Sequence, residues 1–252
     1  MRDLSQNMYE TKDANTYARG SWGYTVLRTV YTEESERLVP LAIDRLKLWT
    51  SAWYLHVNRY PMYGDRWIQR QRPNGIVNDE LGRRFRVELL ENRQRLDLPN
   101  MNDAEHDHVK RLCGVFDEWV VSVGGSVDDR VMTPRLCDCL VMDEDSMRCL
   151  AALPTDTPPL RTAETEEERR EWRSRGDAYL WLLDTRAVRR FNPASDESRF
   201  RGWMKVDASK LDESWFQKVS RIDRTGSDEW VLECREMKET SGDKANWFDV
   251  VC

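Results

Sequence analysis

The chain has 252 residues, of which 33% are charged and 40% hydrophobic, and its formal net charge at pH 7 is −6. A chain of this length can bury a sizeable core without disulfides, and its apolar and aromatic content excludes a disordered protein. The negative charge argues against a general nucleic-acid-binding protein, because contacts with phosphate need a basic surface. Two features are unusual, namely the 11 tryptophans and the excess of arginine over lysine.

The N-terminal sequence and the cysteines predict a soluble, cytoplasmic protein. Residues 1–17 are polar and lack the apolar stretch of a secretory signal, and no apolar run is long enough to cross a membrane. The six cysteines do not have the spacing of a disulfide framework, so we expect free thiols in a reducing compartment. We also expect no membrane partner and no cofactor.

The first part of the chain predicts an arm, a strand and a helix. Residues 1–20 are polar and unpatterned, which predicts a flexible arm ahead of a single domain over 21–252. Residues 23–31 are rich in β-branched and aromatic side chains, as strands are. Thr32 can cap a helix whose apolar residues recur every three or four positions, and Pro40 would start or kink that helix.

Two further helices are predicted before the middle of the chain. Asn78 can cap the first of them, and Asn102 or Asp103 can cap the second, which glycines 124 and 125 would end. The apolar residues of both recur at the spacing of a helix that covers a core. They are Leu81, Phe85 and Leu89 in the first helix and Val109, Leu112, Phe116, Trp119 and Val123 in the second.

The second half of the chain predicts short strands around one helix and an insertion. Asp145 can cap a helix over 146–153, which Pro154 ends. Residues about 154–177 combine proline with runs of glutamate and arginine, which indicates an exposed charged insertion. The segments of strand length are 136–142, 179–184, 203–207 and 229–235.

The predicted elements do not alternate regularly between strand and helix. Their order predicts an α+β fold in which a mixed or mostly antiparallel sheet is covered by helices. A ferredoxin-like core with a helical insertion is one candidate arrangement.

Four segments carry further motifs: GYTVLRTVYTEESE from residue 23, CLVMDEDSMRCLAALP from residue 139, YLWLLDTRAV from residue 179 and RGWMKVD from residue 201. They resemble a family of uncharacterised proteins of filamentous ascomycete fungi, whose members open with a GYT-x-x-RT strand. This chain has Leu27 where the family usually has tyrosine. No activity or catalytic residue is attached to that family, so the resemblance implies no site.

Three of the apolar runs end in aspartate, at Asp143, Asp184 and Asp207. Carboxylates at the carboxyl ends of neighbouring parallel strands can hold a divalent cation, so these are candidate catalytic residues. The corresponding enzyme would be a metal-dependent hydrolase or phosphoryl-transfer enzyme, with Glu144 or Asp145 as a further ligand or base. Aspartate also ends strands and caps helices without any such function, and antiparallel strands would separate the three residues.

Histidine and cysteine indicate a site less strongly. His106 and His108 are two residues apart, so their rings would point in different directions on a helix. Cys137 and Cys139 would share a strand face, although a buried thiol is a commoner outcome than a zinc ligand. The cysteines that could complete a zinc site are Cys113, Cys149 and Cys234. No glycine-rich phosphate loop and no GxSxG motif is present, and no metal is predicted.

Arginine outnumbers acidic residues between positions 59 and 95, where Trp67 also lies. Tryptophan beside Arg28, Arg84 or Arg86 would suit an anionic or aromatic ligand, so these four are candidate binding residues. We therefore expect a non-catalytic binding or interaction protein for a small molecule or a protein, accessory to a specialised (secondary-metabolite) pathway. The metal-dependent enzyme is the alternative.

Overall fold

The computed structural model describes residues 22–59, 85–98, 100–123, 134–156, 178–192, 201–208 and 211. The strands are β1 (Trp22–Arg28), β2 (Phe85–Leu90), β3 (Asp138–Met142), β4 (Tyr179–Asp184) and β5 (Trp203–Asp207). The helices are α2 (Glu33–Arg59), α5 (Arg93–Leu96), α6 (His106–Ser122), α7 (Pro134–Cys137), α8 (Glu144–Ala152) and α10 (Thr185–Arg190). None of these helices combines the length and the apolar character that a membrane span needs.

The described strands form one mixed sheet in the order β2-β1-β3-β4-β5. β1 runs parallel to β2 and to β3, whereas β4 runs antiparallel to both of its neighbours. The predicted α+β fold with a mixed sheet is therefore confirmed. The ferredoxin-like arrangement is not found in these strands, because its split βαβ unit keeps apart the two strands that a helix joins. Here β1 and β2, which precede and follow α2 in the sequence, are direct neighbours in the sheet.

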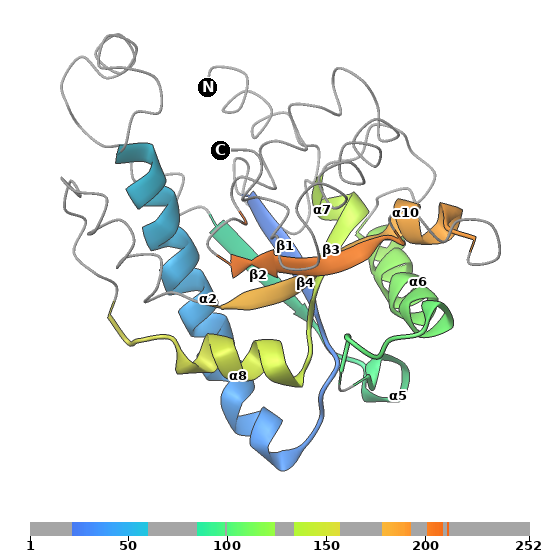
Figure 1. Ribbon diagram of the computed structural model, residues 1–252, viewed down its shortest axis with the longest axis horizontal. Coiled ribbons are helices and arrows are strands. Elements are labelled where there is room, and N and C mark those ends of the chain that lie inside the picture. The colour runs from blue at the N-terminus through green and yellow to red at the C-terminus, as the bar shows by residue number, and fades with distance from the viewer. Residues whose placement is uncertain are drawn as a thin grey trace, which may run out of the picture.

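Helices cover both faces of the sheet, with α2 and α8 on one side and α6 on the other (Figure 1). The alternation of side chains along a strand explains why two cores form. Tyr24 and Val26 of β1 belong to the core beneath α2 and α8, whereas Leu27 belongs to the core beneath α6. In β3, Leu140 and Val141 divide in the same way.

Strand β2 lies where the spacing of apolar residues predicts a helix. Phe85 is buried, and its ring lies 4.7 Å from that of Trp22, measured between centroids. Val87 and Leu89 pack into the same core, so the odd-numbered residues of β2 share one face. The interval of four between Phe85 and Leu89 is even, so it fits a strand face as well as a helix face. Asn78 and Leu81 lie outside the described residues.

The capping residues are partly those expected. Thr32 accepts a hydrogen bond from the backbone N–H of Ser35 at 3.1 Å, which fixes the start of α2, and the helix continues through Pro40. Helix α6 begins after Glu105, without a side-chain cap, rather than at Asn102 or Asp103. Its predicted apolar residues are buried, except that Val123, at its C-cap, is half-buried.

Strands β4 and β5 have the predicted bounds, and β3 is shorter than the predicted run because α7 occupies its beginning. Several predicted features lie outside the described residues. They are the arm at 1–20, the glycines at 124 and 125, the strand at 229–235 and all but the first three residues of the insertion at 154–177.

Candidate functional site

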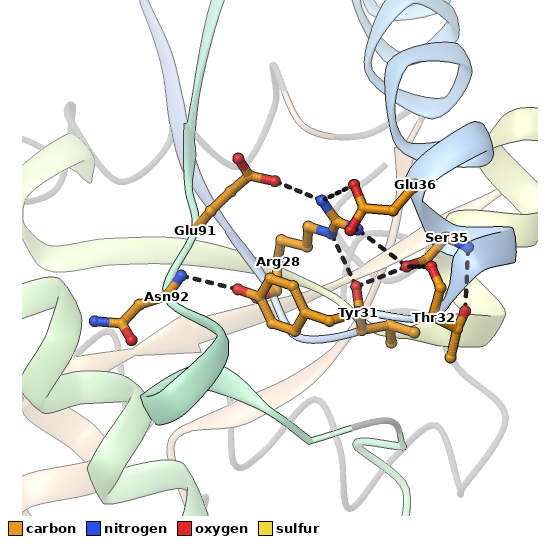
Figure 2. A network of polar contacts seen from close by, with 8 residues as sticks. Arg28, Tyr31, Thr32, Ser35, Glu36, Glu91 and Asn92 are labelled. Carbon is orange, nitrogen blue, oxygen red and sulfur yellow. Dashed lines mark hydrogen bonds and ion pairs between the residues drawn. The ribbon is translucent and has the colours of Figure 1, made fainter.

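Among the residues that the structure describes, an extensive polar network surrounds Arg28, at the carboxyl ends of β1 and β2 (Figure 2). Its side chain is 5% exposed, and each of its guanidinium nitrogens donates to the chain. Nε donates to the carbonyl of Val30 at 2.8 Å. Nη1 donates to Glu36 at 3.2 Å and to Glu91 at 2.6 Å, and Nη2 donates to Ser35 at 3.0 Å and to Glu36 at 2.6 Å. The five N–H donors of an arginine are thus all used.

Tyr31 covers one face of this guanidinium. The Arg28 Cζ atom lies 4.8 Å from the centre of the Tyr31 ring, a cation–π contact. The Tyr31 hydroxyl donates to the carbonyl of Arg28 at 2.8 Å and accepts from the backbone N–H of Asn92 at 2.9 Å, as Figure 2 shows. Tyr31 therefore joins the end of β1 to the segment that follows β2.

The charges in this network stabilise one another. Burial acts to lower the pKa of Arg28, but hydrogen bonds to Glu36 and Glu91 outweigh it and raise that pKa. The hydrogen bond from Arg28 lowers the pKa of Glu36. Burial raises the pKa of Tyr31. The guanidinium keeps no donor for a ligand, so Arg28, predicted as a binding residue, instead links the end of β1 to α2 and to Glu91, the residue after β2.

The connections of the sheet change direction at β1. Helix α2 leads from β1 to β2 over one face, and α6 leads from β2 back to β3 over the other face. In open α/β sheets, ligands bind at such a reversal, outside the carboxyl ends of the two central strands. Here these are β1 and β3.

At this reversal, the ends of β1 and β3 are joined by hydrogen bonds within the chain. The backbone N–H and the hydroxyl of Thr29 both donate to the carbonyl of Met142, each at 3.2 Å. The N–H of Leu98 donates to the carbonyl of Thr29 at 3.0 Å, and the N–H of Met101 donates to Asp143 Oδ2 at 3.1 Å. The segment from Leu98 to Met101, which the sequence did not single out, thus fastens the ends of β1 and β3.

Asp143 is fully buried and accepts three hydrogen bonds. Oδ1 accepts from the backbone N–H of Ser146 at 3.0 Å, and Oδ2 accepts from Met101 N and from Trp181 Nε1, the latter at 2.8 Å. Asp143 is therefore the N-cap of α8, the role that the sequence suggested for Asp145.

The other two predicted aspartates do not join Asp143. The antiparallel register places Asp184 opposite Asp138, the first residue of β3, whereas Asp143 follows the last residue. The length of β3, about 16 Å at 3.3 Å per residue, separates the two positions. Asp184 Oδ1 accepts from two backbone N–H groups and caps α10. Asp207 pairs with Tyr179 on β4, so it lies two strands from β3.

No group of three histidine, cysteine or acidic residues within the described part of the chain could hold a metal ion. The described cysteines, Cys113, Cys137, Cys139 and Cys149, form no disulfide. Burial raises the pKa of the Cys113 and Cys139 thiols, which keeps both protonated near neutral pH. They are therefore poor nucleophiles and poor metal ligands.

His106, at the start of α6, packs as an aromatic side chain. Its ring lies 5.3 Å from that of Phe191 and 6.0 Å from that of Trp203. Both ring nitrogens are buried without a hydrogen-bond partner. Burial lowers the pKa of His106, with a smaller contribution from Lys110, while Asp107 opposes the change.

A second polar network, absent from the sequence predictions, centres on Glu88 of β2. Its carboxylate accepts from Trp119 Nε1 and from Arg135 Nη2, both at 2.9 Å. The Arg135 guanidinium also lies 5.3 Å from the centre of the Trp119 ring. The available signal is a glutamate between two apolar residues, Val87 and Leu89, because a carboxylate in such a position needs a partner when it is partly buried.

The predicted basic and aromatic region is only partly described. Arg86 lies exposed on β2, and its Nη1 donates to the carbonyl of Phe85 at 3.0 Å. Trp67 and Arg84 lie outside the described residues. Comparisons of the chain with models of protein families, with curated proteins and with solved structures find no match.

Proposed function

We propose that this chain is a non-catalytic binding or interaction protein. One observation carries the proposal. The charged atoms of Arg28 and Asp143, both buried at the carboxyl ends of the parallel strands, form hydrogen bonds with other parts of the chain. A catalytic acid, base or electrophile needs an atom that can reach the substrate. Here the charged atoms bond to the chain's own backbone and side chains, which makes this edge a rigid support.

The sheet topology favours this proposal over the metal-dependent enzyme. A metal-assisted hydrolase needs oxygen ligands that converge on one point. Asp184 and Asp143 lie at opposite ends of β3, and Asp207 lies two strands away from β3. Two of the three carboxylates, moreover, already cap helices.

The test combines ligand binding with turnover. Thermal unfolding of the full chain would be followed with magnesium, manganese and zinc chlorides and with a panel of anionic and aromatic metabolites. A saturable rise in melting temperature with a metabolite supports the proposal, because a ligand of the native state stabilises it.

Hydrolysis of p-nitrophenyl phosphate, bis-p-nitrophenyl phosphate and p-nitrophenyl acetate would be measured with the same metals. We expect no turnover above that of the metal ions alone. Metal-dependent turnover that Asp207→Asn abolishes, and that the exposed control Asp156→Asn retains, would overturn the proposal.

A further inference from the structure

Helix α2 carries an exposed stripe with two leucines, beside the face that packs into the core. Leu41 is 47% exposed and Leu48 is 38% exposed. A separation of seven residues is close to two helical turns, so these side chains lie on one line along the helix. The core residues of α2, among them Leu46 and Trp49, face the sheet instead. In Figure 1, α2 runs along the outer side of the described elements.

Two residues of opposite charge lie between these leucines. Asp44 and Arg45 follow Leu41 by three and four positions, so they belong to the same stripe. Within the described residues, neither side chain forms a hydrogen bond or an ion pair. The Nε atom of Arg45 is nevertheless buried without a hydrogen-bond partner. A buried donor without an acceptor is destabilising, so a carboxylate placed beside this guanidinium would stabilise it through the attraction of opposite charges.

The stripe is symmetric about the peptide bond between Asp44 and Arg45. An antiparallel second copy of α2, related by a two-fold axis at that bond, places Leu41 against the partner's Leu48. The same axis places Asp44 against the partner's Arg45, and each contact occurs twice. We propose that two copies of this chain form a symmetric homodimer through Leu41, Asp44, Arg45 and Leu48 of antiparallel α2 helices.

The charges favour a second copy over an unrelated occupant. A purely apolar stripe would accept any apolar surface, whereas Asp44 and Arg45 need charges in the reverse order. The same helix, turned end to end, supplies that order. One helix pair with two leucines on each side forms a small interface, so the dimer should dissociate on dilution.

Sedimentation velocity of the full chain, from low micromolar to high concentration, tests this proposal. We expect the unaltered chain to shift from monomer to dimer as its concentration rises. Leu41→Glu should weaken the dimer at least about tenfold, because it places a charge in the apolar contact. Asp44→Arg and Arg45→Asp should each do the same, because each sets like charges opposite one another.

The double variant Asp44→Arg/Arg45→Asp distinguishes this pairing from other contacts. It restores both opposite-charge pairs, so the dimer should return to within a few-fold of its original affinity. Lys47→Asp is the matched control, since Lys47 is exposed on α2 but lies outside the stripe, and it should leave the dimer unchanged. Far-ultraviolet circular dichroism would check that every variant is folded.

Three results would overturn the proposal. They are a monomer at every concentration, a dimer that Leu41→Glu leaves intact, and a failure of the folded double variant to dimerise. The first would leave the stripe to another protein or to a different segment of this chain. None of these results bears on ligand binding or on turnover, so the dimer and the proposed binding function succeed or fail separately.

Discussion

Arg28 and Glu36 form a two-pronged ion pair, in which Nη1 and Nη2 each reach one carboxylate oxygen, at 3.2 and 2.6 Å. Arg28 ends β1, and Glu36 lies in the first turn of α2, so the pair fixes the angle at which the helix leaves the sheet. Arg28 is buried, whereas the side chain of Glu36 is 62% exposed. The cation is therefore the member of the pair that depends most on its partners.

Arg28→Lys tests this dependence. An ammonium has three donors and no planar fork, so it cannot reach the carbonyl, the hydroxyl and both carboxylates that the guanidinium reaches. We expect a loss of about 2–4 kcal/mol in the free energy of unfolding, measured by urea denaturation. The exposed Arg37→Lys is the control and should change stability by less than about 0.5 kcal/mol. Equal stability of the two variants would contradict the role given to Arg28.

Tyr31→Phe separates the hydroxyl of Tyr31 from its ring. The ring stays over the guanidinium, but the carbonyl of Arg28 and the N–H of Asn92 each lose a partner. The expected loss is about 1–2 kcal/mol, typical of a partly buried hydroxyl with two hydrogen bonds. Urea denaturation measures it, and a variant as stable as the original chain would show that water replaces the hydroxyl.

The sequence predicts the fold best where burial alone decides the structure. β4 and β5 are short runs of mostly apolar residues, and their predicted bounds agree with the structure. Where β2 lies, the sequence predicts a helix, which is wrong, because the spacing of Phe85 and Leu89 fits both a helix face and a strand face. Parallel pairing with β1 settles that ambiguity, and no local pattern encodes such pairing.

The polar networks depend on the same long-range pairing. Glu91 lies 63 residues from Arg28 in the sequence, and Met101 lies 42 residues from Asp143. A sequence shows that Arg28 and Asp143 are charged residues at strand ends. It does not show that distant parts of the chain form hydrogen bonds with their charged atoms. From the sequence alone, both residues therefore look like candidate site residues.

Asp143→Asn tests whether this aspartate stabilises the fold. Asparagine keeps one acceptor oxygen and replaces the other with an NH2 group, which would face N–H donors. We expect a loss of about 2–4 kcal/mol in the free energy of unfolding, measured with guanidinium chloride. The control is Asp207→Asn, because Asp207 is a half-buried residue at the end of the edge strand β5, and this change should have a much smaller effect. A reversed order would restore Asp143 as a candidate for chemistry.

The buried thiols should resist alkylation. Because burial raises the pKa of Cys113 and Cys139, almost no thiolate is present at either residue near pH 7. Iodoacetamide labelling of the native chain, mapped by peptide mass spectrometry, should modify both more slowly than the half-buried Cys149. Urea should remove the difference, since all thiols are then exposed. Rapid native labelling of Cys139 would contradict its described burial.

His106 should make the fold less stable in mild acid. Burial lowers the pKa of His106 in the native state, whereas the unfolded chain takes up this proton near the ordinary value of about 6.5. Below that pH the unfolded state binds more protons than the native state, so the free energy of unfolding falls as pH decreases. The loss from this residue continues until the pH reaches the lowered native pKa.

His106→Phe isolates this contribution. Phenylalanine retains an aromatic ring beside Phe191 and Trp203 but cannot take up a proton. Urea denaturation between pH 8 and pH 5 should show that the variant gains stability relative to the original chain below about pH 6.5, with a constant difference above it. A difference that does not change with pH would mean that the imidazolium finds a partner in the native state. In that case the imidazole would take up its proton while it lies between the two rings, and NMR titration of its ring protons would show an ordinary pKa.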